Sequence, residues 1–406
     1  MADDIGYEAF GAYGSQQYST PTVDRLASAG VRFTHAYSTP VCTPSRVEVL
    51  TGKSNIRNYV DFGTLAPGQY TFANLFKDAG YASAIAGKWQ LHGGTNVEGT
   101  LPADAGFDTY CLWHTGMTKR PRYWTPSIER DGQLMDLPQG AYGPDVFADF
   151  LIEFMEDNRD RPFFVYYPMV LAHNPFLPTP SSVNRESREQ QANFTDMVSY
   201  MDSNVGRIVA AVDRLGLGER TVVIFTSDNG SPRRIRSVLN DRRIRGGKNT
   251  TLDTGNHVPL IVYAPGTGDG GRVVDDLVSL SDFLPTLADI IGAKLPSNLE
   301  IDGRSFWPRI LGQPGDPREW IFTYFIRRPY SDDPVRRAEV RFAQDRRFKL
   351  YGDGRFYDLT KDIREKDPIP AGEGGPDATA ARRTLELALS SFPVHGELLP
   401  KRMQHR

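Results

Sequence analysis

The sequence predicts an α/β fold: a large, mostly parallel sheet flanked by helices, followed by a smaller antiparallel α+β subdomain. The prediction rests on the length of 406 residues, an alternation of apolar runs with helix-like segments, and a change of texture past residue 305. We therefore expect two domains, a catalytic domain at 1–305 and a small subdomain at 306–406. Hydrophobic residues at 39% and charged residues at 24% exclude a disordered or collagen-like chain.

Four short β-branched or aromatic runs are the clearest strands, at 82–86, 163–167, 221–226 and 259–263. Polar residues follow the first three: Gly87-Lys88, Ala172-His173 and Asp228-Asn229. Ligands bind beyond the carboxyl ends of the strands in open α/β sheets. These polar groups should therefore converge on one edge of the sheet.

Apolar residues recurring every three or four positions predict helices at 145–156, 193–215 and 281–291. Past residue 305, the runs 347–351 and 355–359 are separated by glycines and predict the antiparallel subdomain. We expect residues 372–375 to form a flexible loop and 401–406 a frayed tail.

Charge and cysteine content narrow the class of function. A net charge of -3 lacks the basic field that nucleic-acid binding requires, so we expect no nucleic-acid partner. No apolar stretch reaches eighteen residues, so we expect no membrane span. The two cysteines, Cys42 and Cys111, cannot form a disulfide framework and have no metal-type C-x-x-C spacing.

The most informative motif is Cys42-Thr43-Pro44-Ser45-Arg46, although a lone cysteine is more often a small buried hydrophobe. This pentapeptide resembles the C-x-P-S-R signature of type I sulfatases in the alkaline phosphatase superfamily. Six further segments resemble motifs of that family in the same order. They are A-D-D-I-G-Y at 2–7, T-P-T-V-D-R-L-A at 20–27, G-K-W-Q-L at 87–91, A-H-N-P-F at 172–176, S-D-N-G at 227–230 and R-G-G-K-N-T-T at 245–251.

The resemblance implies an alkaline-phosphatase-like fold and a formylglycine made from Cys42 by a formylglycine-generating or anaerobic maturation enzyme. A hydrated aldehyde offers two hydroxyls on one carbon, one to attack sulfur and one to expel sulfate, which a thiol cannot do. Arg46 matches the arginine that orients this hydrate, and Lys88 and Lys248 match the sulfate-binding lysines. Cations are needed there because negative charge accumulates on the sulfate oxygens during attack.

The metal ligands implied by the motifs are Asp3, Asp4, Asp228 and Asn229, together with position 42. Carboxylate and amide oxygens without histidine or thiolate favour calcium, with magnesium possible, over zinc. Asp-Asn-Gly alone would indicate only a turn. The preceding strand and the Asp3-Asp4 pair favour the metal site instead.

His173 is the candidate general acid for the leaving alcohol, at the family's matching position. Two histidine positions depart from the family pattern. Gln90 stands where the family has a histidine, and glutamine hydrogen-bonds but cannot accept a proton. His92 lies two residues on, one pleat further from the site. Our hypothesis is that His257, where the family commonly has arginine, partly replaces the missing imidazole near the substrate.

The start of the sequence is the other departure. Family members have a strand of apolar residues before A-D-D, and commonly an export signal before that. We expect the first core strand to be missing and Asp3 and Asp4 to be poorly anchored. No signal peptide is present, so the sequence leaves the location open, while the resemblance implies a periplasmic or extracellular protein.

The sequence therefore predicts a hydrolase of sulfate monoesters acting on a sulfated small molecule or glycan, with a carbohydrate favoured. Aromatic and basic residues that could stack on a sugar and contact anions support a carbohydrate; they are Trp113, His114, Arg120, Arg122, Tyr123 and Trp124. Two alternatives stay open: a phosphonate or phosphodiester hydrolase of the same superfamily, and a non-catalytic pseudoenzyme that binds sulfated glycans.

Overall fold

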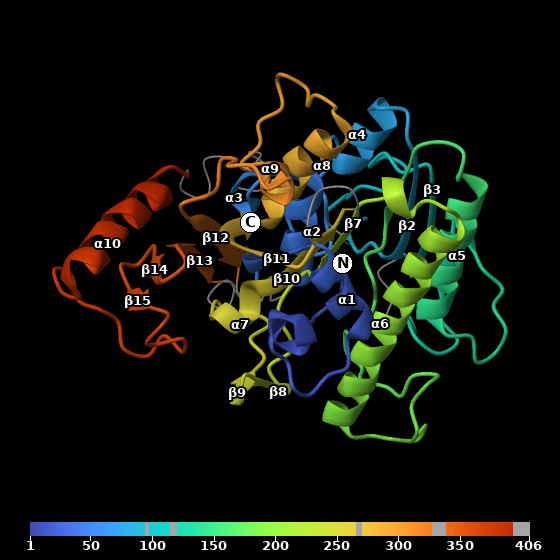
Figure 1. The fold of residues 1–406 in the computed structure, drawn as a ribbon, viewed down its shortest axis with the longest axis horizontal. Coiled ribbons are helices and arrows are strands. Elements are labelled where there is room, and N and C mark those ends of the chain that lie inside the picture. The colour runs from blue at the N-terminus through green and yellow to red at the C-terminus, as the bar shows by residue number, and fades with distance from the viewer. Residues whose placement is uncertain (94–96, 114–119, 265–269, 327–337, 393–406) are drawn as a thin grey trace.

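A computed structural model describes residues 1–93, 97–113, 120–264, 270–326 and 338–392, drawn as the coloured ribbon in Figure 1. Two sheets form the centre of the larger domain, with strand orders β11-β1-β10-β7 and β5-β4-β3-β2-β6. Their strands are β1 (Val31–Tyr37), β2 (Ala82–Lys88), β3 (Thr109–Trp113), β4 (Ile128–Arg130), β5 (Gln133–Leu134), β6 (Phe163–Tyr166), β7 (Val223–Thr226), β10 (His257–Tyr263) and β11 (Arg272–Ser279).

The N-terminal residues join these two sheets. Ala2 N donates to Thr226 O at 2.8 Å on one side, and Asp3 N donates to Leu171 O at 2.8 Å on the other. Residues 1–3 thus lie between β7 and the segment after β6, and Ala2 forms an isolated parallel bridge with Ser227. Both Asp3 and Asp4 are fully buried, so the expectation that they would be poorly anchored is wrong. Beyond Met1, residues of β6 and β7 line an apolar cavity of about 570 Å³.

The strand directions match the predicted class. β2 pairs in parallel with both β3 and β6, and β1 pairs in parallel with β11. All four predicted strands are present, which confirms the α/β fold. However, β10 runs antiparallel to both β1 and β7, and β4 and β5 are also antiparallel. The alternation of strands and helices in the sequence could not reveal the antiparallel direction of β10. This strand follows the hairpin at 236–245 and a four-residue helix at 253–256, rather than a long crossover helix.

Helices cover both faces of the sheet. Figure 1 shows α5 and α6 side by side at the right of the domain. It shows α2, α8 and α4 near one another, from the centre of the view toward its top. The α-helices of this domain are α1 (Pro21–Ala29), α2 (Cys42–Thr51), α3 (Asn55–Asn58), α4 (Phe72–Asp78), α5 (Gly143–Asp157), α6 (Gln190–Arg214), α7 (Asp253–Asn256), α8 (Phe283–Ile291) and α9 (Trp307–Ile310). The three predicted helices correspond to α5, α6 and α8.

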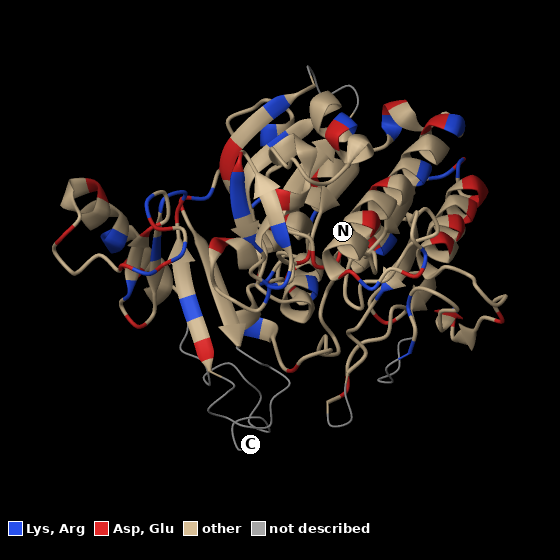
Figure 2. Ribbon diagram, turned by 90° about the horizontal axis from the view of Figure 1, so that it is seen from below, with Lys and Arg blue, Asp and Glu red and all other residues tan. Residues whose placement is uncertain are grey.

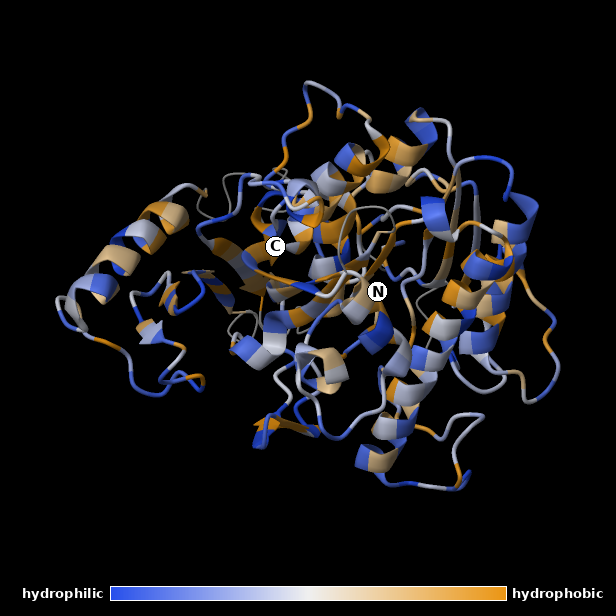
Figure 3. Ribbon diagram, viewed as in Figure 1, coloured by the Kyte–Doolittle hydropathy of each residue, from blue (hydrophilic) through white to orange (hydrophobic). Residues whose placement is uncertain are grey.

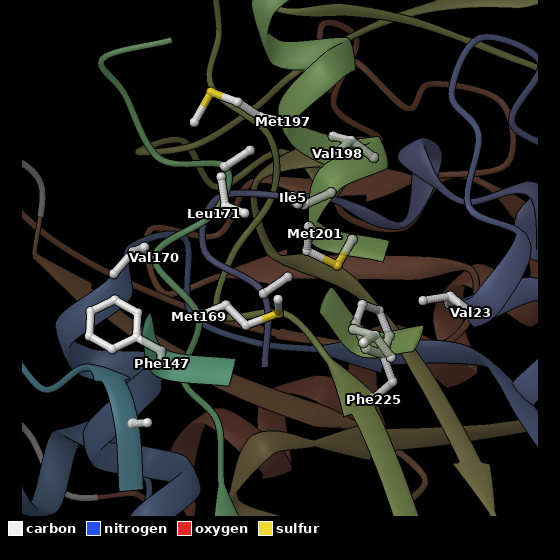
Figure 4. Packing of buried hydrophobic residues seen from close by; sticks show 14 of the residues in the cluster. Ile5, Val23, Phe147, Met169, Val170, Leu171, Met197, Val198, Met201 and Phe225 are labelled. Carbon is white, nitrogen blue, oxygen red and sulfur yellow. The ribbon is translucent and has the colours of Figure 1, made fainter. Parts of the chain in front are cut away.

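Helical spacing of apolar residues explains how α6 packs. Met197 and Met201, four residues apart, share a buried cluster with Met169, Leu171 and Phe225 (Figure 4). A second buried cluster collects the apolar residues of α2, α4 and α8 on the other face. Figure 3 shows the resulting pattern, with hydrophobic strands inside and helices of mixed character outside.

Smaller elements complete the larger domain. A hairpin of β8 (Arg236–Leu239) and β9 (Arg242–Arg245) precedes the R-G-G-K segment. Short 3-10 helices lie at Tyr7–Ala9, Gly11–Tyr13, Gly218–Arg220 and Leu280–Asp282. Basic and acidic residues are interspersed over the elements (Figure 2). Among the described residues, no helix is both long and apolar enough to cross a lipid bilayer.

The C-terminal part is a separate antiparallel sheet with one helix, at the left of Figure 1. Its strands are β12 (Ile321–Ile326), β13 (Glu339–Gln344), β14 (Phe348–Tyr351) and β15 (Phe356–Asp358), and α10 (Gly375–Ser390) packs against them. The two predicted strands are β14 and β15. Gly375 begins α10, so the loop predicted at 372–375 ends there. The tail predicted at 401–406 lies outside the described residues.

Candidate active site

Polar side chains from the ends of several strands meet at one edge of the sheet, together with the N-terminus of α2. Asp3 and Asp4 follow the bridge that Ala2 forms with Ser227, Lys88 ends β2, and Asp228 lies two residues after β7. Backbone bonds hold the arrangement in place: Asp228 N donates to Ala2 O, and Asp4 N donates to Asp228 Oδ1 at 3.0 Å.

Three buried carboxylates form the centre of this cluster. Asp3, Asp4 and Asp228 are fully buried, and one oxygen from each lies within 4.8 Å of the others. Burial, followed by repulsion from Asp3, raises the pKa of Asp228 above its usual value. Such a concentration of negative charge is costly in a protein interior unless cations neutralise it.

Four cationic side chains surround the three carboxylates. Arg46 Nη2 lies 2.8 Å from Asp228 Oδ2 and 3.6 Å from Asp3 Oδ1. Lys88 Nζ lies 2.8 Å from Asp3 Oδ1, and Lys248 Nζ lies 2.5 Å from Asp4 Oδ2. The fourth cation, Arg122, is 3.7 Å from Asp3 Oδ2. With four positive and three negative side chains, the cluster carries a local excess of one positive charge and is suited to an anion.

The residues present also fit a divalent cation. Asn229 Oδ1 is buried and has no hydrogen-bond partner among the residues that the structure describes, while its Nδ2 donates to Asp4 Oδ1 at 2.9 Å. An amide oxygen left without a donor beside three carboxylates is the arrangement expected of a metal ligand. The donors are all hard oxygens, as the sequence predicted, so Asp3, Asp4, Asp228 and Asn229 could hold a divalent cation.

Cys42 is the first residue of α2 and is buried beside the cluster, with 2% of its surface exposed. Its Sγ lies 3.7 Å from Gln90 Oε1. Ser45 fixes the turn before the helix, because its hydroxyl oxygen accepts from Thr39 N at 3.1 Å. The structure therefore brings Gln90 and Cys42 together, as the family resemblance implied.

His173 lies at the mouth of the cluster, with 19% of its side chain exposed. Its Nδ1 is 2.6 Å from Asn174 O, and its Nε2 is 3.7 Å from Asp4 Oδ2. Burial lowers the pKa of His173 well below its usual value, and Lys248, Arg122 and Lys88 lower it further. The Tyr123 hydroxyl donates to the backbone carbonyl of His173 and fixes this segment.

His257 is not part of the cluster. Its Nε2 lies 2.8 Å from Thr34 O and its Nδ1 3.2 Å from Asp253 Oδ2, while its ring stacks on Tyr7 at 3.9 Å. Burial lowers the pKa of His257, but Asp253 outweighs it and the net shift is upward. Both ring nitrogens are bonded to Asp253 and Thr34 rather than to residues of the cluster, so the structure does not support the hypothesis that His257 replaces the missing imidazole.

Arg122 was not predicted as a residue of the central site; the sequence placed it only in a loop suited to sugars. Its guanidinium carbon lies 4.0 Å from the centre of the Trp113 ring, a cation–π contact that holds it toward Asp3. The alternation of basic and aromatic residues was the available signal, but it could not rank Arg122 above its neighbours.

Comparisons with known proteins agree with this geometry. The family model described as Sulfatase matches residues 1–293. The chain belongs to the sulfatase family. Human arylsulfatase A is 34% identical over 370 residues, covering 83% of this chain and 71% of that protein. This sulfatase is therefore a hydrolase of sulfuric esters.

Two solved structures share the fold of this sulfatase. One is a protein in complex with its substrate D-glucosamine-2-N,6-O-disulfate, with a TM-score of 0.79, 21% identity and 97% of each chain covered. The other is a phosphonate monoester hydrolase of Agrobacterium radiobacter, with a TM-score of 0.74, 22% identity, and 96% of this chain and 94% of that chain covered.

Proposed function

We propose that this sulfatase cleaves sulfate monoesters of a carbohydrate, using a formylglycine made from Cys42 and a bound calcium ion. One observation carries the proposal: Cys42 is buried at the N-terminus of α2, beside a cluster in which four cations surround three carboxylates. A thiol in that place lacks the second hydroxyl whose deprotonation expels sulfate, whereas an aldehyde hydrate carries one hydroxyl to attack sulfur and one to expel sulfate.

The residues of the chain have distinct roles in this reaction. Lys88 and Lys248 place positive charge where negative charge accumulates on the sulfate oxygens, and their fixed positions avoid reorganisation. Arg46 holds Asp228 and orients position 42. Asp3, Asp4, Asp228 and Asn229 hold calcium, which, when bound, polarises the sulfate and the nucleophile.

His173 supplies the proton to the leaving alcohol, because its imidazole reaches the edge of the cluster while remaining partly exposed. Burial and the nearby cations lower the pKa of His173, so this role requires the negative charge of the bound sulfate ester to raise it again. Gln90 hydrogen-bonds the group at position 42 but cannot accept its proton. Trp113, with Arg122 stacked on it, offers an aromatic face and a cation for a sugar. A structural neighbour that takes a disulfated glucosamine as substrate supports a sugar as the alcohol.

Phosphonate monoester hydrolysis is the second candidate, because a solved hydrolase of that kind shares the fold. The sulfate reading is favoured by the family match and by the 34% identity to arylsulfatase A. The third hypothesis, a non-catalytic pseudoenzyme that binds sulfated glycans, requires Cys42 to remain a thiol in the mature protein.

The proposal is tested by co-expression with a formylglycine-generating enzyme, followed by mass spectrometry of the Cys42 peptide. We expect conversion of the thiol to the aldehyde, and kcat/KM higher for sulfated monosaccharides than for an aryl phosphonate. Persistent thiol with intact binding of sulfated glycan would favour the pseudoenzyme instead. Faster cleavage of the phosphonate would favour the second candidate.

Calcium should stabilise this sulfatase against heat. A ligand at a hundredfold excess over its Kd contributes about 2.7 kcal/mol to folding, which raises the unfolding temperature by several degrees. Thermal unfolding of chelator-treated protein, with and without calcium chloride, measures the shift. Asp228→Asn, which removes one carboxylate, should reduce it. Identical unfolding temperatures with and without calcium would contradict the proposed metal site.

A further inference from the structure

A buried lysine of the small C-terminal sheet contacts the larger domain close to the sulfate-binding cluster. Lys349 lies on β14 with none of its surface exposed. Its ammonium donates to the backbone carbonyl of Thr251 and lies 2.9 Å from Glu365 Oε1. Thr251 is only three residues beyond Lys248, the cation paired with Asp4.

Thr251 is also held through its side chain. The Tyr351 hydroxyl lies 2.8 Å from Thr251 Oγ1 and hydrogen-bonds Glu365. Tyr351 is 2% exposed and Thr251 5% exposed, so water competes little for these bonds. Lys349 and Tyr351, both anchored on one Glu365 carboxylate, therefore fix the backbone and the side chain of Thr251.

The segment from Lys248 to Thr251 is attached at both ends, and within it Thr250 N donates to Gly247 O at 2.9 Å. Lys248 N donates to Ser231 O at 3.0 Å, and Asn249 N donates to Pro40 O at 2.8 Å, so the larger domain holds its beginning. Its other end is held by Lys349 and Tyr351. Asn249 has a positive φ of 63°, so the chain turns sharply between the two attachments.

A purely structural role does not account well for this choice of residues. Burying a lysine and a glutamate costs several kcal/mol, and well-packed apolar residues often replace such pairs without loss of stability. Lys349 already lies in an aromatic setting, 4.0 Å from the centre of the Phe342 ring, where an apolar side chain would pack. What an apolar residue could not provide is a donor to Thr251 O.

We propose that Lys349, Tyr351 and Glu365 are positioning residues for the sulfate-binding Lys248, so that the C-terminal sheet completes the anion site. The inference rests on the proposed function in one respect, the contact of Lys248 with the sulfate. Displacing a binding group by about 1 Å can cost about a hundredfold in rate. Freeing Thr251 should therefore weaken sulfate binding without any direct contact between Lys349 and sulfate.

The test is a double-mutant cycle on Lys349→Met and Lys248→Met, with calcium present and inorganic sulfate as the probe. Titration calorimetry gives the sulfate Kd, and kcat and KM on a sulfated monosaccharide are measured in parallel. We expect Lys349→Met to raise the sulfate Kd about tenfold, an intermediate loss for partial displacement. In the Lys248→Met background, Lys349→Met should change the sulfate Kd very little further, because effects transmitted through one residue are not additive.

Two further variants keep the result interpretable. Tyr351→Phe removes only a hydroxyl and should raise the sulfate Kd less, in the same direction, even if Lys349→Met does not fold. Arg347→Ala, just before β14 and paired with Asp358 and Asp377 rather than with Thr251 or Glu365, should leave the Kd unchanged. An unchanged Kd in folded Lys349→Met, or full additivity with Lys248→Met, would overturn the positioning role. If the wild type neither binds nor hydrolyses sulfate esters, the proposed function fails first and this inference with it.

Discussion

We expect that replacing Cys42 with alanine will abolish sulfate ester hydrolysis and leave the fold and the binding of inorganic sulfate intact. The side chain is buried, and its one described polar contact is the 3.7 Å approach of Sγ to Gln90, which is weak. Loss of a single sulfur from this site should cost about 1 kcal/mol of stability. Turnover should fall by about 10⁶-fold, the loss found when a hydrolase loses its nucleophile.

Cys111 provides the matched control for this prediction. It is also fully buried, on β3, and burial raises the pKa of its thiol to about 12, so it stays protonated and unreactive. Cys111→Ala should reduce stability by a similar amount and leave kcat unchanged. We expect thermal unfolding and turnover of the matured proteins to separate the two variants. Residual turnover in Cys42→Ala near the wild-type rate would contradict a reaction at position 42.

Replacing Arg46 with methionine should destabilise the protein by about 3–5 kcal/mol, the cost of leaving a buried charge without its partner. Arg46 is 1% exposed and bonds Asp228 Oδ2 through two nitrogens, at 2.8 and 3.2 Å. A third bond reaches Lys88 O at 3.1 Å. Arg46→Lys should rescue little, because an ammonium cannot reproduce this geometry.

The pH dependence of the Arg46→Met defect follows from Asp228. Burial and repulsion by Asp3 already raise the pKa of this carboxyl in the folded state, and removing Arg46 raises it further. When the pKa of a carboxyl is higher in the folded state than in the unfolded state, the group stabilises the fold at low pH. This contribution to the free energy of unfolding is lost as the pH rises through the folded-state pKa. The defect should therefore be smallest below the ordinary aspartate pKa and largest at neutral pH.

Urea unfolding at several pH values measures this dependence. Arg46→Met combined with Asp228→Asn should recover part of the stability, because the neutral amide no longer needs a cation. Arg130→Met, which breaks an exposed pair with Glu153, should cost less than about 1 kcal/mol at any of these pH values. Equal defects for Arg46→Met and Arg130→Met would argue that the buried cluster is not electrostatically coupled.

Much of the site was accessible from the sequence because its residues follow strands. The carboxyl ends of the central strands meet at one edge, so Lys88, His173 and Asp228 were expected to converge before any contact was known. Local motifs also placed Cys42 and Arg46 four residues apart, which on α2 brings both to its first turns. The structure brings all five together.

The roles of side chains whose contacts are distant in sequence could not be predicted in this way. His257 opens β10, and a motif comparison says nothing about which way its ring points; the bonds to Asp253 and Thr34 decide that. Arg122 reaches Asp3 across more than a hundred residues, and Lys349 reaches Thr251 across 98. No pattern within either segment specifies such a pairing.

The sequence by itself determined the family, the α/β class, the oxygen-rich donor set and three of the four central cations, because these depend on short motifs and on the periodicity of apolar residues. Only the tertiary structure decided that residues 1–3 bridge the two sheets, that His257 is bonded to Thr34 and Asp253 rather than to the site, and that the C-terminal sheet contacts the segment bearing Lys248. The physical reason is that burial and hydrogen bonding between remote segments depend on how the whole chain packs, and the free energy of each contact is set by its surroundings rather than by its neighbours in sequence.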